Sequence, residues 1–344
     1  MTDHPSGPEI TTVGDDFAVV FFDAEPRTYD DLKPGTTYTY DGVTFRTLER
    51  PPGERLSTIV TVNDVHFGET ICGLDGDNPN QGDVFTSQPG EPPYPETMNA
   101  AVVEEIAAIE PDLVVVKGDL TGNGTLDEYE QFLAMYQPAF GDRLVHIRGN
   151  HDSYHGGGYA EFGPQRRDVP GASVALIDTA RVHKKNGYLS HEEEAWLDDL
   201  GAAGGPHSDT PVLVMGHHHI WPPTSSRRSP DYFGLVPDDS ERLIDVFARR
   251  PRLAGYFAGH THRNRVRRFA DRTQHRPFVE VACVKDFPGA WAEYRVFEGG
   301  ILQIVHRAKR PDAVAWTDRT RGMFGGLYPE YAFGALEERC FRVV

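Results

Sequence analysis

Apolar and polar residues follow two distinct periods along the chain from residue 55 onward. The run at 58–62 is rich in β-branched residues and predicts a strand, and the continuous apolar run at 113–116 predicts a buried strand. Apolar residues at helical spacing predict helices over 98–109 and after a capping box formed by Thr125 and Glu128. This alternation of strands with helices predicts an α/β core.

The same pattern continues through the middle of the chain. Apolar runs at 143–147, 212–215 and 253–257 predict three more strands. Ser190 and Glu193 form a second capping box, which predicts the start of another helix. The core therefore extends over at least two hundred residues of alternating elements.

The C-terminal part departs from this alternation. Residues 278–281 and 294–306 predict meandering antiparallel strands, with a turn at Glu298-Gly299-Gly300. The tail after residue 310 is rich in aromatic side chains. Two roles stay open for that tail: packing on the core, or a contact in a homodimer.

The first fifty residues predict a small β module. Residues 17–22 favour a strand, and 32–45 predict a hairpin around Asp41-Gly42. Within it, Leu32-x-Pro34-Gly35-Thr36-x-Tyr38 resembles the tyrosine corner of fibronectin type III domains, where a Tyr hydroxyl bonds to nearby backbone. With a joint at Pro51-Pro52-Gly53, three parts are expected: a truncated fibronectin-III-like module at 1–52, a main domain at 53–310 and a tail at 311–344.

Composition and charge narrow the classes of partner. The 344 residues are 39% hydrophobic and carry a formal net charge of −18, with Lys+Arg 34 against Asp+Glu 52. An acidic surface repels nucleic acid, so no duplex-binding face is expected. A small anionic substrate is still allowed, because bound cations reverse the sign of the field inside a pocket.

The cysteines and the chain start favour a cytoplasmic protein without a membrane span. Cys72, Cys283 and Cys340 share no CxxC spacing, and their odd number argues against a disulfide framework. Met1-Thr2-Asp3-His4-Pro5 lacks the basic and apolar regions of a signal peptide. A Gly/Pro/Asp-rich loop at 71–97 is long enough to be either functional or disordered.

Five short polar motifs each follow directly on an apolar, strand-like run. Because the ends of neighbouring strands meet at one sheet edge, these motifs predict one cluster of metal-capable side chains. The motifs are Asp64-Val65-His66, Gly118-Asp119, Gly149-Asn150-His151-Asp152, Gly216-His217-His218-His219 and Gly259-His260-Thr261-His262.

The ligand types indicate two transition metals and phosphoester chemistry. Asp64 and His66 point the same way on an extended strand end, and Asp119 can bridge two cations with its two oxygens. Oxygen and imidazole ligands without thiolate suit Mn, Fe, Zn, Co or Ni, with Mn or Fe favoured here. Two metals would keep a net positive charge for a phosphate oxygen and would make hydroxide available near neutral pH.

This series of motifs resembles the calcineurin-like metallophosphoesterase superfamily over residues ~55–310. The resemblance implies a four-layer α/β (α+β) fold, with two packed β-sheets flanked by helices and the site on loops at strand ends. It assigns one metal to Asp64, His66, Asp119 and His262, and the other to Asp119, Asn150, His217 and His260. It makes His151 a catalytic contact of the phosphate and the leaving oxygen, oriented by Asp152.

Features near the motifs point to a subclass. Gly122 stands where purple acid phosphatases carry a Tyr ligand, and Asp152 stands where nuclease branches often carry Glu. The motifs, with the segment Lys285-Asp286-Phe287-Pro288-Gly289-Ala290-Trp291, resemble most the class III cyclic nucleotide phosphodiesterases and glycerophosphodiesterases. Further possible substrate contacts are His219, His155 and Arg148, for which loop packing or a salt bridge is the alternative.

The sequence therefore predicts a phosphodiesterase that acts on a small phosphoester through a metal-bridging hydroxide, with His151 assisting the leaving oxygen. A phosphomonoesterase with the same metals is the first alternative. A non-catalytic binding protein that keeps the metals as a scaffold is the second.

Overall fold

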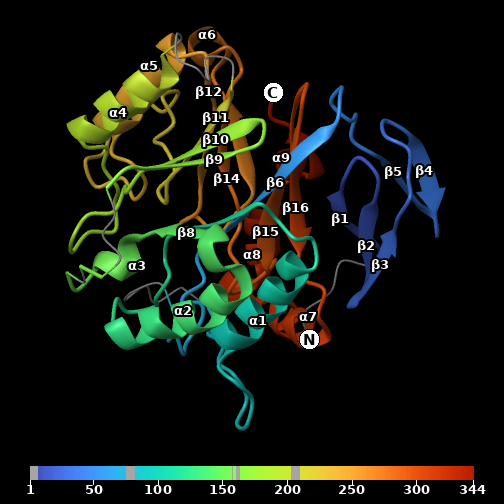
Figure 1. Ribbon diagram of the computed structural model, residues 1–344. Helices are drawn as coiled ribbons and strands as arrows, with labels where there is room; N and C mark the ends of the chain where they lie inside the picture. The colour runs from blue at the N-terminus through green and yellow to red at the C-terminus, as the bar shows by residue number, and fades with distance from the viewer. Residues whose placement is uncertain (1–6, 75–81, 157, 160–162, 203–209) are drawn as a thin grey trace.

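The computed structural model contains two six-stranded β-sheets stacked face to face, with helices on the outer side of each (Figure 1). It describes residues 7–74, 82–156, 158–159, 163–202 and 210–344. Two inner sheets between two helical layers form the four-layer α/β arrangement expected from the motifs, so the prediction of fold class is confirmed.

The first sheet holds three parallel strands followed by antiparallel ones. β6, β7 and β8 run parallel, and β15 pairs with β6 in the opposite direction. Its order is β17 (Cys340–Arg342), β16 (Gly300–Arg307), β15 (Ala290–Phe297), β6 (Arg55–Val62), β7 (Leu113–Lys117) and β8 (Leu144–Ile147).

The second sheet has a parallel centre and antiparallel edges. β10, β11, β12 and β14 are parallel, while β13 and β9 lie antiparallel at the two ends. Its order is β13 (Arg265–Arg268), β14 (Pro277–Glu280), β12 (Leu253–Ala258), β11 (Val212–Met215), β10 (Ala172–Leu176) and β9 (Gln165–Val169).

One strand prediction was wrong in its pairing. Residues 278–281 were expected to join 294–306 in one antiparallel meander, but β14 belongs to the second sheet and runs parallel to β12. Only β15 and β16 form the expected antiparallel hairpin. The short run Phe278–Val281 is buried against both helices and the facing sheet, and its apolar pattern carries no information about which sheet it joins.

The strand predicted to be buried, β7, is buried on both faces, and so is β11. Along β7, Val115 faces the other sheet, while Val114 and Val116 face the helices. Along β11, Leu213 faces the first sheet, and Val214 faces the helices on its outer side. Successive side chains point to opposite faces, so both strands are continuous apolar runs.

Helices cover the outer face of each sheet (Figure 1). The capping boxes at Thr125 and Ser190 are both formed at the predicted helix starts. The first sheet is covered by α1 (Tyr94–Ala107), α2 (Leu126–Phe140), α7 (Pro311–Thr320) and α8 (Tyr328–Phe333), and the second by α4 (His191–Gly201) and α5 (Pro237–Arg249). Short elements are η1 (Gly141–Arg143), α3 (Asn150–Ser153), α6 (Ala270–Thr273), η2 (Met323–Gly326) and α9 (Leu336–Arg339).

The N-terminal residues form two small β units, of which the first lies beside β16 and the second packs on the first. Thr12 donates a hydrogen bond to the Val305 carbonyl at 2.9 Å, which ties the first unit to the core. The Tyr38 hydroxyl accepts a hydrogen bond from the Lys33 backbone N–H at 2.8 Å, the contact expected of a tyrosine corner. The units are β1 (Glu9–Val13), β2 (Ala18–Phe22) and β3 (Glu25–Tyr29), and β4 (Thr37–Tyr40) with β5 (Val43–Arg46).

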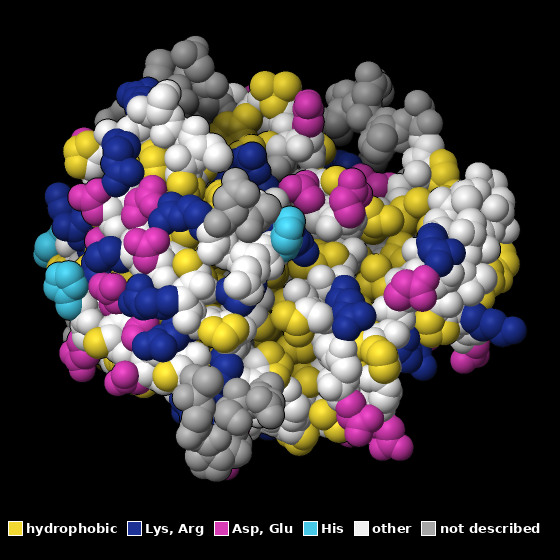
Figure 2. All heavy atoms as spheres, turned by 90° about the horizontal axis from the view of Figure 1, so that it is seen from above, with side chains coloured by type: hydrophobic (Ala, Val, Ile, Leu, Met, Phe, Trp, Pro, Cys, Tyr) yellow, Lys and Arg dark blue, Asp and Glu magenta, His cyan; other side chains and the backbone are white. Residues whose placement is uncertain are grey.

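Charged side chains of both signs are interspersed on the helical side of the molecule. At the left of Figure 2, Lys and Arg side chains alternate with Asp and Glu over the side that carries α4 and α5. Ion pairs such as Arg249–Asp198 at 2.5 Å join these helices.

Two segments discussed in the sequence analysis lie outside the described residues. They are residues 1–5, where no signal peptide is expected, and residues 75–81 of the loop at 71–97. Among the helices of the described part, none has the length and apolar character needed to cross a bilayer.

Replacing Phe257 by Ala tests the contact between the sheets. Phe257 is fully buried, and its ring meets Tyr294 of the opposite sheet edge-on, with centroids 5.0 Å apart. Because the substitution leaves a cavity, the free energy of unfolding should fall by about 3–5 kcal/mol in a urea titration. Leu56→Ala, at a side chain that is 38% exposed, is the control and should cost under about 1 kcal/mol. Equal losses in both variants would contradict this core assignment.

Candidate metal centre

All five motifs lie just beyond the carboxyl ends of parallel strands, four on loops and the third at the start of the short helix α3. Asp64 and His66 follow β6, Asp119 follows β7, and Asn150 follows β8. From the second sheet, His217 follows β11, and His260 and His262 follow β12. The facing sheets thus bring polar side chains from distant parts of the chain together. The expected cluster is present, but the expectation of a single sheet edge was wrong, because strands of both sheets contribute.

Several of these residues hold a strained backbone. A positive φ is uncommon outside glycine and is tolerated best by Asn, Asp and His. Such strain persists where the surroundings fix it, and it is concentrated at functional sites. The motif residues with positive φ are Asp64 (54°), His66 (49°), Asp119 (50°), His260 (67°) and His262 (54°).

Glycine in the second motif allows the loops to approach each other closely. A Cβ on Gly118 would lie 2.7 Å from His217 Nδ1 and 2.8 Å from the Gly149 backbone nitrogen. Any side chain there would push two motif loops apart. The glycine of Gly118-Asp119 is therefore required by packing at the site.

One group of ligand atoms gathers around Asp64. Asp64, His66 and His262 have one potential ligand atom each within 4.8 Å of one another. His262 Nε2 lies 3.5 Å from Asp64 Oδ1, and His66 Nε2 lies 3.4 Å from Asp119 Oδ2. With Asp119, these are the four residues expected to hold one metal.

A second group gathers around His217. His217 Nε2 lies 3.1 Å from the Asn150 side-chain oxygen and 3.3 Å from Asp119 Oδ2. The His260 ring lies beside His217, with centroids 5.1 Å apart. These residues, again with Asp119, are the set expected to hold the other metal.

Asp119 therefore lies between the two groups. Its Oδ2 atom faces His66 on one side and His217 on the other, at 3.4 and 3.3 Å. Burial would raise the pKa of Asp119, but the imidazoles of His217, His151 and His66 together outweigh it and hold that pKa well below its usual range. Burial would lower the pKa of His217, but the carboxylates of Asp119 and Asp64 and the Lys117 carbonyl raise it to about 9. The carboxylate is poised to stay ionised between two sets of nitrogen donors.

The donor set fits two transition metals. Asp64 and Asp119 are 0% and 2% exposed, so their charges need buried positive partners. Carboxylate and amide oxygens combined with imidazole nitrogens suit Mn, Fe, Zn, Co or Ni. The arrangement would place Asp64, His66, Asp119 and His262 on one ion and Asp119, Asn150, His217 and His260 on the other.

Two carboxylates that the sequence analysis did not select support the histidines. Glu69 Oε2 lies 2.5 Å from His66 Nδ1, and Asp286 Oδ2 lies 3.5 Å from His262 Nδ1. Lys285 joins the two carboxylates, with Nζ 2.5 Å from Glu69 and 3.9 Å from Asp286. Carboxylates on the far nitrogen of a ligating histidine fix its tautomer and strengthen it as a ligand. Two signals in the sequence were available: Glu69 lies three positions after His66, and Asp286 lies in the segment Lys285-Asp286-Phe287 that resembles the family.

The other two histidines of the expected ligand set contact backbone carbonyls. His217 Nδ1 lies 2.8 Å from the Lys117 carbonyl, and His260 Nε2 lies 2.8 Å from the Phe233 carbonyl. The half of the centre around Asp64 is thus supported by charged groups, and the half around His217 by neutral ones.

His151 lies beside His66 of the centre, and Asp152 is bonded to the backbone of the second and third motifs. The His151 ring is 4.4 Å from that of His66, and its Nδ1 lies 2.7 Å from the Gly122 carbonyl. Asp152 accepts hydrogen bonds from the backbone of Leu120, Thr121 and Gly149 and from the Thr121 hydroxyl. Asp152 therefore joins the segments that carry the second and third motifs. The His151 ring itself contacts the Gly122 carbonyl, through Nδ1.

The remaining candidate residues lie around the centre in different surroundings. His219 is buried, with Nε2 2.7 Å from the Tyr232 hydroxyl, and Arg148 Nε lies 2.7 Å from Asp178. His155 is exposed. His218 has Nδ1 2.9 Å from the Thr179 hydroxyl and Nε2 3.2 Å from the Lys185 carbonyl, as expected of a packing residue. Substrate contact by His219, His155 or Arg148 stays a prediction.

Comparison with known proteins identifies similar chains. The calcineurin-like phosphoesterase family matches residues 57–264. A 3′,5′-cyclic adenosine monophosphate phosphodiesterase from Pseudomonas aeruginosa is 32% identical over 167 residues, 47% of this chain and 58% of that protein. A glycerophosphodiester phosphodiesterase from Enterobacter lignolyticus is 29% identical over 181 residues, 48% of this chain and 61% of that protein. The chain thus spans less than two thirds of either relative.

Solved structures share the fold. A dimetal phosphatase from Danio rerio has a TM-score of 0.55 at 14% identity, covering 74% of this chain and 97% of that chain. A purple acid phosphatase from yellow lupin seeds has a TM-score of 0.51 at 12% identity, covering 89% of this chain and 73% of that chain. At these identities the likeness concerns the arrangement of elements alone.

Replacing Glu69 by Gln tests the support of His66. The neutral amide keeps the shape but loses the charge that holds His66 Nδ1, so metal affinity should fall by about 10–100-fold. Titration against a competing chelator measures it. Glu91→Gln, at an exposed carboxylate on the same segment, is the control. Equal affinities in Glu69→Gln and wild type would remove Glu69 from this role.

Proposed function

The chain belongs to the calcineurin-like phosphoesterase family, and from that premise we propose that it is a dinuclear metal-dependent phosphodiesterase. Its proposed substrate is a small diester such as a cyclic nucleotide or a glycerophosphodiester, the classes named for its curated relatives. The observation that carries the proposal is Asp119, whose Oδ2 lies within 3.4 Å of histidines from two different motifs.

The metals and the protein have separate tasks in this proposal. Two bound ions, manganese or iron by preference, would supply positive charge for phosphate oxygens and an acidified water. The chain holds its ligands in fixed positions through Glu69, Asp286 and the carbonyls of Lys117 and Phe233. A site whose side chains are already oriented needs no rearrangement when substrate arrives.

His151 is the proposed group at the leaving oxygen. Its backbone N–H donates to Asp119 Oδ1 at 2.9 Å, which places the residue against the bridging carboxylate. With Nδ1 engaged by the Gly122 carbonyl at 2.7 Å, Nε2 is the nitrogen available to the substrate. Asp152, by joining the loops on which Thr121 and Gly149 lie, would hold His151 in place.

The cations around the centre favour a diester over a monoester. A monoester dianion carries one more charge than a diester and is best matched by an unpaired Lys or Arg. Lys285 lies 2.5 Å from Glu69, Arg148 lies 2.7 Å from Asp178, and Lys117 donates to the Ala258 carbonyl at 2.9 Å. Each of these cations already has a partner, which supports the diester proposal.

We further propose that the protein is cytoplasmic and forms a homodimer. Cys72, Cys283 and Cys340 are buried thiols, and none of the three forms a disulfide, as is usual in a reducing compartment. The tail after residue 310 contributes β17 to the first sheet and α7 and α8 to its helical layer.

Relative rates on two chromogenic esters test the reaction class. The metal-loaded protein should hydrolyse bis(p-nitrophenyl) phosphate faster than p-nitrophenyl phosphate, and one of 2′,3′- and 3′,5′-cyclic AMP should also be turned over. A higher rate on the monoester would favour the phosphomonoesterase alternative. Full metal loading without hydrolysis of any ester would favour a binding protein.

Replacing His151 by Ala tests the proposed leaving-group contact. Turnover of a diester should fall by about 10²–10⁴-fold, because the variant loses its acid–base group, while metal content stays at the wild-type level. His191→Ala, whose side chain is 90% exposed on α4, is the control and should retain full turnover. Unchanged turnover in His151→Ala would exclude His151 from the mechanism.

A further inference from the structure

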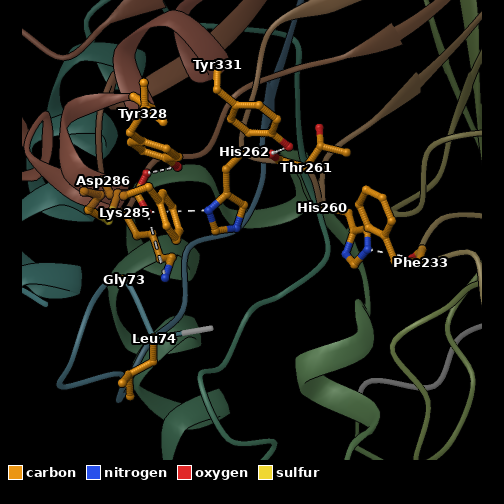
Figure 3. A pocket seen from close by; sticks show the side chains of 13 residues that line it. Gly73, Leu74, Phe233, His260, Thr261, His262, Lys285, Asp286, Tyr328 and Tyr331 are labelled. Atoms are coloured by element: carbon orange, nitrogen blue, oxygen red, sulfur yellow. Dashed lines mark hydrogen bonds and ion pairs between the residues drawn. The ribbon is translucent and has the colours of Figure 1, made fainter. Parts of the chain in front are cut away.

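A pocket of about 640 Å³ opens directly beside the metal centre. His260 and His262 form one of its walls, so a phosphate held at the centre would lie at its mouth (Figure 3). The volume is within the range of pockets that bury small organic ligands. Another part of the wall comes from residues 323–331, which lie beyond the 57–264 region shared with the family.

Exposed apolar side chains converge on this pocket. Several of the large apolar side chains that are exposed in the described residues lie on its rim, although such residues are normally scattered singly over a surface. Met323 and Tyr328 form its buried base. The exposed rim residues are Leu74, Phe233, Phe324, Leu327 and Tyr331.

The tail is tied to the loops that carry the ligands. The Tyr328 hydroxyl donates to Asp286 at 2.7 Å, and Asp286 in turn faces His262. The Tyr331 hydroxyl donates to the Thr261 carbonyl at 2.9 Å, between the two ligating histidines (Figure 3). The apolar wall is therefore held at a fixed position relative to the metal ligands.

Phe324 occupies a backbone conformation that is costly for its residue type. Its φ is 52°, and Gly325 and Gly326 follow with φ of 67° and 85°. A bulky residue at positive φ is strained, and glycine would adopt the same conformation without strain. Strain of this kind points to function when the side chain stands at a site, as the partly exposed Phe324 ring does here.

The charged groups of the pocket are already paired. Lys285 lies 2.5 Å from Glu69, and Asp286 accepts from Tyr328 and faces His262. Apart from Thr261 and the two histidines on the side of the metal centre, the rest of the lining is apolar or aromatic. An occupant that matches this lining carries no charge of its own beyond the phosphate.

We propose that this pocket binds one ester group of the substrate, and that this group is a planar, uncharged ring such as a nucleobase or another aromatic group. The proposal rests on the phosphodiesterase function proposed above and narrows its substrate class. A diester with an aromatic ester group is preferred over a diester whose ester group is small and polar, such as glycerol. Leu327 and Phe324 are the residues that determine this preference.

Two phosphonates of equal charge test the pocket. Phenylphosphonate and methylphosphonate, compared at a pH where both are dianions, should compete with bis(p-nitrophenyl) phosphate. Burial of a ring should make phenylphosphonate on the order of ten-fold tighter in the metal-loaded wild type. Titration calorimetry of both phosphonates gives the same ratio without relying on turnover.

Two variants and a control assign the preference to the tail. Leu327→Ala and Phe324→Gly should each reduce the phenyl-to-methyl ratio several-fold, with metal content kept. Phe324→Gly should unfold at the same or a higher temperature, because it relieves the positive-φ strain. Leu56→Ala, far along β6 from the centre, should keep the wild-type ratio.

The outcomes separate this inference from the proposed function. Diester hydrolysis with equal affinity for the two phosphonates would overturn the aromatic pocket and leave the phosphodiesterase proposal standing. A wild-type ratio in both tail variants would overturn the role of residues 323–331. Absence of diester hydrolysis together with absence of phosphonate binding would overturn the proposed function, and this inference with it.

Discussion

Two buried carboxylates, Asp64 and Asp119, set the charge that the surrounding structure has to balance. They are 0% and 2% exposed, and a buried charge without a partner costs several kcal/mol. Imidazoles lie close to both carboxylates: His262 beside Asp64, and His66 and His217 on either side of Asp119. Several residues of the expected ligand set have a positive φ, and this strained backbone directs their side chains to one point.

The fold makes this concentration of polar groups possible. Two sheets with apolar faces stack on each other, and the ends of their parallel strands meet at one edge. The rigid sheets fix where each loop begins, while the loops carry the chemistry. The Glu69–Lys285–Asp286 cluster then supports one half of the centre with charge, whereas carbonyls support the other. The two halves are therefore expected to differ in metal affinity.

The parts of the fold and of the candidate site that the sequence predicts are those that depend on short, local patterns. The strands before Asp64, Asp119 and His217 are short apolar runs that end in polar motifs, so both the strand and its site residues are visible within ten positions. The capping boxes at Thr125 and Ser190 are equally local. Such features depend on neighbours in sequence, and the structure contains them where they were expected.

Features that depend on tertiary packing could not be predicted from the sequence. The sheet to which β14 belongs is decided by its partners β12 and β13, and its apolar pattern fits either sheet. The contact of Tyr328 with Asp286 joins positions 42 residues apart, and nothing in either segment predicts it. The pocket wall at 323–331 likewise exists only because α8 packs back on the loop that carries His262.

The most direct test of the shared role of Asp119 is elemental analysis of the purified protein beside its Asp119→Ala and Asp64→Ala variants. The account predicts about two transition-metal ions per chain in the wild type. Asp119→Ala should lose metal from both positions, because its carboxylate is common to them, and Asp64→Ala should lose metal from one. No metal in the wild type under any reconstitution, or equal losses in the two variants, would contradict the account.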